Sequence, residues 1–375
     1  MPLSYSVQYS TDGSTWTTLS NVQNISMNTG RQYMLDQYSA STANFVVRYP
    51  NGYTSPITAM IPGTFVRIQM PTASSRFFGR IKDVAVNYGI PYTASVGNAD
   101  YLNVTVEGAF AEISRMSGQD YSMPAGSFQT QLGLANTATN LTITSNFTSN
   151  MGANTVSGTW GDWLNASLVT QNGRMSDTQG VRTIACNGPY NALTCDVNFS
   201  DTTNNATNQR YDQANFGAWS DNYYTQVTVD PAGFAGQTAT KAGATLPYRT
   251  YTVNSLSASE SQALDQANFL LSQYGTQQFA LTSVSCLAEA QNTFMLDALA
   301  PSGGGSRAQF GGMIGARVSV TFRGTVYYSI IEGISVTATP ESSRYTFYLS
   351  GADLNNYLIL DDSVFGRLDY NKLGY

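Results

Sequence analysis

The sequence predicts a mainly β protein with a few helices, of the α+β class, in which two related antiparallel β-barrels are separated by an inserted region of mixed structure. Three observations lead to this prediction: two blocks with period-two alternation of apolar residues, one well-capped helix between them, and glycines that recur in both blocks. The length of 375 residues suits two or three domains with substantial cores.

Residues 1–115 are expected to form the first barrel. A hairpin opens the chain, because Tyr5, Val7 and Tyr9 alternate with polar residues before the turn residues Asp12 and Gly13. Further period-two runs cover 44–49, 65–70, 78–86 and 101–107. Several short strands without a long helix between them are typical of an antiparallel barrel or sandwich.

Residues 116–255 are expected to form a connector and an inserted middle domain. Gly, Ser, Thr and Asn dominate 116–159, which predicts irregular surface. A short helix is expected from Asp162 to about 172, an exposed loop over 201–208, and a strand over 223–229.

The clearest helix is predicted within 256–275. Ser257 and Glu260 have the spacing of a capping box, Gly275 is placed for a left-handed C-cap, and apolar residues recur at helical spacing. Residues 276–350 are then expected to form the second barrel, with strands over 317–322, 327–336 and 345–349.

The two β blocks resemble each other in sequence. Segment 63–68 matches 315–320, segment 79–86 matches 329–336, and segment 106–108 matches 349–351, at offsets of 252, 250 and 243 residues. Any two β meanders share alternation, but these matches include glycines. A closed ring of three such chains would present six similar barrels.

Composition excludes several functions. The sequence contains no histidine, which excludes Ser-His-Asp and Cys-His catalytic centres and histidine metal sites. A net charge of -6 and the absence of any basic run argue against binding nucleic acid through its phosphates. The first residues lack the pattern of a secretory signal, and no apolar stretch is long enough to cross a bilayer.

Other motifs receive structural interpretations. Cys186, Cys195 and Cys286 lack the spacing of a zinc site; a Cys186–Cys195 disulfide is conceivable, but buried free thiols are favoured. Asp361 and Asp362 could form a catalytic or cation-binding pair, although neighbours on a strand face opposite ways. We expect no catalytic residues, no cofactor and no metal.

The carboxyl-terminal segment 351–375 is expected to pack on a neighbour and form an interface. Its apolar residues would make the contact: Leu358, Leu360, Val364, Phe365 and Leu368.

Three segments resemble siphophage minor tail proteins: the carboxyl-terminal string 358–369, the segment 246–253 before the capped helix, and 172–175 after the short helix. The amino-terminal block, through 30–32 and 78–81, resembles the first barrel of tail hub proteins. The family that this resemblance implies is that of tail-tip or baseplate hubs, which is related in fold to the baseplate hub of contractile-tailed phages. This resemblance implies a structural, non-enzymatic virion protein at the distal tail, assembled in the host cytoplasm, that closes the tail tube and opens for genome ejection.

The resemblance also implies the partners. They are two further copies in a homotrimer, a distal tail or tube protein, the tape-measure protein, and tail fibre or tip proteins. Viral DNA would pass without specific binding, and the host envelope would be contacted indirectly.

Two other functions stay open. A carbohydrate- or receptor-binding module could use Trp219, Tyr223 and Tyr224 to stack on sugar rings. A peptidoglycan hydrolase would need a pair of carboxylates, and no second motif supports one.

Overall fold

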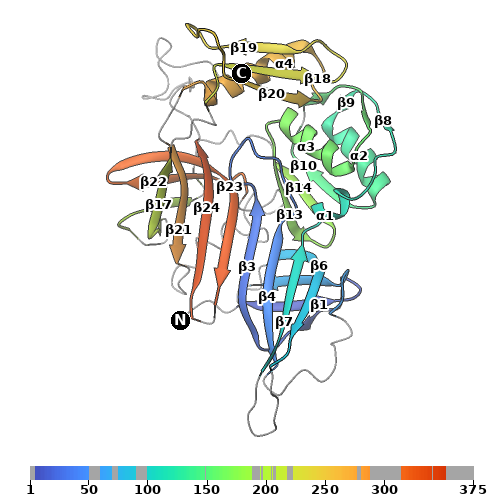
Figure 1. Ribbon diagram of the computed structural model, residues 1–375, viewed down its shortest axis with the longest axis vertical. Coiled ribbons are helices and arrows are strands. Elements are labelled where there is room, and N and C mark those ends of the chain that lie inside the picture. Colours follow the sequence, from blue (N-terminus) through green and yellow to red (C-terminus); the bar gives the residue numbers. More distant parts are fainter. Residues whose placement is uncertain are drawn as a thin grey trace.

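The computed structural model describes residues 5–49, 60–69, 75–89, 99–147, 149–187, 195, 197–203, 205, 208–217, 223–276, 280–287, 314–339 and 341–351. A large sheet of 14 strands forms the lower part of the molecule in Figure 1. A unit of short strands and helices packs beside its upper end, and a small three-stranded sheet with one long helix lies at the top.

The first half of the large sheet comes from the amino-terminal block. Its strands are β1 (Ser6–Ser10), β2 (Thr17–Thr18), β3 (Val22–Gly30), β4 (Thr42–Tyr49), β5 (Phe65–Gln69), β6 (Ser75–Asn87) and β7 (Asp100–Glu107). The predicted opening hairpin is confirmed, because β1 pairs with β2 on one side and with β5 on the other. Alternate residues of β4 and β7 are buried, as period-two runs require.

The second half comes from two separate parts of the chain. Its strands are β15 (Val197–Ser200), β16 (Asn208–Arg210), β17 (Gln213–Gly217), β21 (Ala280–Leu287), β22 (Arg317–Phe322), β23 (Thr325–Ala338) and β24 (Ser343–Gly351). Strands β15 to β17 therefore reach this half from the region before the small sheet. The domain boundaries proposed from the sequence stay a prediction.

Both halves repeat one strand plan. Across the sheet the order is β3-β4-β7-β6-β5-β1 in the first half and β17-β21-β24-β23-β22-β15 in the second. If the strands of each half are counted along the chain without β2 and β16, the two orders are identical. The halves differ at one end, since β1 is antiparallel to β5 whereas β15 is parallel to β22. The sequence match between the two β blocks thus corresponds to a repeated arrangement of strands.

The repeat extends to irregular features. A β-bulge interrupts the pairing of β6 with β7 between Ile81 and Asp83, and another interrupts β23 and β24 between Ile331 and Gly333. These positions differ by 250 residues. The turn glycines Gly63 and Gly315 both have positive φ, and their N–H groups donate to the carbonyls of Ile81 and Ile331.

The predicted mainly β class with a few helices is confirmed, but the described strands do not close into two barrels. Strand β3, at the end of the first half, pairs antiparallel with β23 of the second half instead of returning to its own half. The halves consequently join edge to edge in one open sheet. Edge pairing depends on contacts between distant strands, which alternation within a strand does not encode.

The middle unit contains three helices and several short strands. These are α1 (Phe110–Ile113), β8 (Tyr121–Met123), β9 (Gly126–Ser127), α2 (Phe128–Thr139), β10 (Thr142–Ser145), β11 (Asn150–Met151), β12 (Asn154–Val156), α3 (Trp160–Thr170), β13 (Arg174–Gly180) and β14 (Thr183–Asn187). Irregular surface was expected over 116–159, and this is wrong. Phe128, Leu132 and Met151, all within this range, are buried in a core that belongs to the middle unit.

The predicted short helix is present as α3 but begins earlier. Thr159 caps it, accepting a hydrogen bond from the N–H of Asp162, whose carboxylate in turn accepts from the N–H of Thr159. The capping box therefore involves Thr159 and Asp162.

The upper unit combines β18 (Gln226–Pro231), β19 (Gln237–Thr240) and β20 (Thr250–Ser255) with α4 (Glu260–Tyr274). The long helix is confirmed, but its caps differ from the prediction. Ser259 accepts from the N–H of Gln262, whereas Ser257 is buried and bonded to Ser255. Gly275 has a right-handed φ of -78°.

Two further findings concern sequence features. The three cysteines are free thiols, and Cys186 and Cys286 are buried. In the part of the chain that the structure describes, no helix is long and apolar enough to cross a membrane.

Candidate functional site

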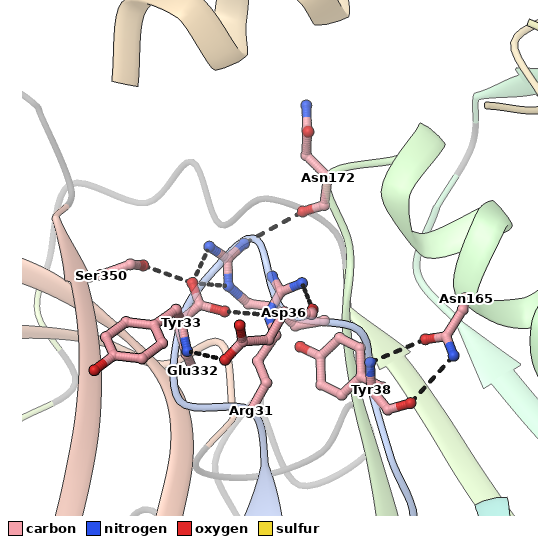
Figure 2. Close-up of polar contacts among 9 residues, drawn as sticks. Arg31, Tyr33, Asp36, Tyr38, Asn165, Asn172, Glu332 and Ser350 are labelled. Atoms are coloured by element: carbon pink, nitrogen blue, oxygen red, sulfur yellow. Dashed lines mark hydrogen bonds and ion pairs between the residues drawn. The ribbon is translucent and has the colours of Figure 1, made fainter. Parts of the chain in front are cut away.

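A buried ion cluster lies where the two sheet halves meet the middle unit. Its centre is Glu332, the bulged residue of β23, whose side chain is fully buried. Figure 2 shows Arg31 and Ser350 beside this carboxylate. The cluster joins three segments that are far apart in sequence, so it defines how the parts of the protein are held together.

Two arginines neutralise the carboxylate. Nε of Arg31 donates to Oε2 of Glu332 at 3.0 Å, and Nε and Nη2 of Arg174 donate to Oε1 at 3.1 and 2.6 Å. The hydroxyl of Ser350 donates to the same Oε1 at 2.5 Å. The side chains of Arg31 and Arg174 are 7% and 4% exposed. Three charged groups are thus withdrawn from water together.

The arginines are placed by their own segments. Arg31 follows β3 directly, and its N–H donates to the carbonyl of Glu332 at 3.0 Å. Arg174 begins β13, and its Nη1 donates to the carbonyl of Asn172 at 3.3 Å. Tyr38 lies under the Arg31 guanidinium, with the ring centroid 4.7 Å away. A delocalised guanidinium suits both the carboxylate and the ring.

The loop after Arg31 connects the cluster to helix α3. The N–H of Tyr38 donates to the side-chain carbonyl of Asn165 at 3.1 Å, and the Asn165 amide donates back to the carbonyl of Tyr38 at 3.1 Å. Figure 2 shows this reciprocal pair beside the ion cluster. The sheet joint and the middle unit therefore share one polar network.

Burial alone would raise the pKa of Glu332. Attraction to Arg174 and Arg31, with hydrogen bonds from Ser350 and Arg174, outweighs burial and lowers the pKa to about 2. The carboxylate is therefore charged at every pH at which such a protein normally works.

The low pKa predicts acid sensitivity. Because the pKa of Glu332 falls from 4.5 to about 2 on folding, its stabilisation is complete above pH 4.5 and is lost as the pH drops towards 2. The loss amounts to roughly 3 kcal/mol. We expect the difference in unfolding free energy between the wild type and Glu332→Gln to shrink over this interval in urea titrations. A constant difference would contradict the low pKa.

A second buried carboxylate fixes β13 to the first half. The Asp177 side chain accepts from the N–H of Ser41 at 3.1 Å and of Phe110 at 3.2 Å. Burial raises the pKa of Asp177, although these hydrogen bonds oppose the change. Asp177 thus satisfies backbone donors at the entrance to the middle unit.

Close backbone approach at the joint requires glycine. Gly333 pairs with Gly30, and a Cβ at Gly333 would overlap the backbone of Arg31. We expect Gly333→Ala to lower the free energy of unfolding by about 1–3 kcal/mol, because the strands must separate. Gly351→Ala is the control, since a Cβ there meets no atom within 4 Å. Equal effects of the two variants in urea titrations would contradict this reason.

The sequence-predicted interface residues lie outside the described residues: Leu358, Leu360, Val364, Phe365 and Leu368. Asp361, Asp362 and Trp219 also lie outside them. The Tyr224 ring packs against Tyr251 at 5.0 Å, and the Tyr223 ring lies near Lys241 and Arg249. Within the described ranges, no three acidic, cysteine or histidine side chains are grouped as metal ligands would be.

Sequence reasoning missed the ion cluster. Arg31 and Glu332 are 301 residues apart, and Arg174 and Glu332 are 158 apart. One signal was present: Glu332 is an isolated charge within the apolar run 330–334. An acidic residue in such a run needs a buried partner, but the sequence does not show which.

Comparison with solved structures identifies the fold. A tail protein from Neisseria meningitidis matches with a TM-score of 0.63 and 12% identity, covering 94% of this chain and 97% of that one. The 43 kDa tail protein of prophage MuSo2 from Shewanella oneidensis matches with a TM-score of 0.63 and 12% identity, over 93% and 98%.

A component of the Escherichia coli type VI secretion system, described as similar to the T4 bacteriophage tail proteins gp27 and gp5, matches with a TM-score of 0.50 and 7% identity, over 89% and 74%. No protein-family model and no curated protein matches the chain. The fold is that of phage tail proteins, as the sequence resemblance predicted.

Proposed function

We propose that this chain is a structural hub at the distal end of a phage tail, where three copies form a ring that closes the tube and opens for genome ejection. The observation that best supports this proposal is the repeated strand plan, with its two equivalent bulges, within a fold shared with phage tail proteins. Three chains with two similar halves each would match a sixfold tube to a threefold tip.

The composition supports a structural role. Lys and Arg number only 18 in 375 residues, so the wall of such a ring would hold few phosphates. DNA could then pass without being retained, because retention requires neutralising contacts. The proposed partners are the tube protein, the tape-measure protein and fibre or tip proteins, with no chemistry performed on a substrate.

Antibody labelling of intact tails tests the proposal. An antibody raised against the purified chain, detected by gold in electron micrographs, is expected to mark the distal tip alone. Particles produced without this protein are the control and are expected to carry no label. Label along the whole tube, or none on the tail, would contradict the hub role.

A further inference from the structure

The joint between the two sheet halves is an edge-to-edge strand pair. After its bulge, β23 leaves β22 and pairs with β3, from Gly333 opposite Gly30 to Ala338 opposite Ile25. Its other edge pairs with β24 throughout this stretch. On this edge of β23, the neighbouring strand is therefore β22 before the bulge and β3 after it.

Strand β6 of the first half is equivalent to β23, but no described strand pairs with it as β3 pairs with β23. Its pairing with β5 ends at Arg80, Ile81 bonds Thr64, and residues after the bulge pair with β7. Along Asp83–Asn87, the edge that corresponds to the joint pairs with no strand among the described residues.

Exposure reflects this difference. Ile334 and Val336 on β23 are 8% and 6% exposed. Val84 and Val86, the equivalent residues on β6, are only half-buried. At the next equivalent position Ala338 is 4% exposed, whereas Tyr88 is 61% exposed. The first half therefore presents apolar side chains where the second half covers them.

The complementary edge belongs to β17. Strand β17 is the equivalent of β3 and pairs with β21 as β3 pairs with β4. On its other edge, where β3 receives β23, β17 pairs with no strand in the described ranges. One chain thus carries both sides of a second joint, one on each half.

We propose that β17 of a second copy of this chain pairs antiparallel with the Ala85–Asn87 end of β6, reproducing this part of the internal joint between β3 and β23. Each copy uses β6 towards one neighbour and β17 towards the other, so the contact is head-to-tail and can close a ring. This inference rests on the ring in the proposed function and supplies its subunit contact.

The internal joint also sets the register. Asn44 pairs with Thr105, and Ser283 pairs with Tyr348. Thr105 and Tyr348 are equivalent, because each pairs with the first residue after its bulge, Asp83 or Gly333. Ser26 pairs with Asn44 and Asn215 pairs with Ser283, so Ser26 and Asn215 are equivalent.

Thr337, opposite Ser26, is equivalent to Asn87. The copied register therefore places Asn87 of one chain opposite Asn215 of the next. Both side chains are exposed in the single chain.

Disulfide cross-linking of the full chain tests the joint. Opposed residues in antiparallel strands have Cβ atoms about 4.5–5.5 Å apart, which is close to disulfide geometry. We expect Asn87→Cys with Asn215→Cys, in a Cys195→Ser background and oxidised by copper–phenanthroline, to give dimers and trimers on non-reducing gels. Dithiothreitol should return them to single chains.

Three matched variants are controls. Thr18→Cys with Asn215→Cys places a thiol on β2, another exposed strand outside the joint, and should give no multimers. Each single cysteine at 87 or 215 should give none beyond background. Asn87→Ser with Asn215→Ser should keep the wild-type particle mass, which shows that the substitutions themselves are tolerated.

The outcomes separate the joint from the ring. A particle of three chains that does not cross-link through 87 and 215 would overturn the β6–β17 joint and leave the proposed hub intact. A single chain at all protein concentrations, with no cross-linking, would overturn both.

Discussion

We expect Glu332→Gln to lower the free energy of unfolding by about 3–5 kcal/mol at neutral pH, because it leaves two buried arginines without a countercharge. Arg31 and Arg174 are 7% and 4% exposed, so water cannot replace the lost carboxylate. Glutamine keeps the size and one oxygen, so the change isolates the charge. Urea unfolding followed by circular dichroism measures the effect.

The internal repeat supplies the matched control. Lys82 occupies the bulge position equivalent to Glu332, but its ion pair with Glu107 at 2.9 Å is 45% exposed on the lysine side. Lys82→Gln should cost less than about 1 kcal/mol. Similar losses in both variants would show that burial of the Glu332 cluster has no special effect on stability.

The second large effect is expected from Phe128→Ala in the middle unit. Phe128 is fully buried, and its ring centroid lies 5.2 Å from that of Phe147 and 6.3 Å from that of Trp163. Removing a buried ring costs about 3–5 kcal/mol through lost contacts and the cavity that remains. Thermal and urea unfolding should both show the loss.

Phe234→Ala is the control, because that ring is 44% exposed. We expect it to change the unfolding free energy by less than about 0.5 kcal/mol. A loss below 1 kcal/mol for Phe128→Ala would mean that the region 116–159 is not the packed core described above.

The sequence predicted the parts of the fold that are local. Strands β4, β5 and β7 have uninterrupted alternation, and α4 has a full helical stripe with a nearby cap. The sequence match between the two β blocks includes Gly63 and Gly315. Both residues have positive φ, which glycine adopts more readily than other residues. The sequence match predicted two related β blocks, which the repeated strand plan confirms; the two equivalent bulges were not predicted.

The predictions that failed concern contacts between residues that are far apart in the sequence. The closing of two barrels was inferred from the strands alone, yet β3 pairs with β23 some 300 residues away. The core of the middle unit was missed because Ser, Thr, Asn and Gly surround its few apolar residues. The spacing of Phe128, Leu132 and Ala135 on α2 was the available signal.

That three copies close a hollow ring is tested most directly by electron cryomicroscopy of the purified full chain. We expect a threefold particle with six similar sheet lobes around a channel, and with β6 of each copy beside β17 of the next. A twofold dimer, or single chains that never associate, would contradict the ring.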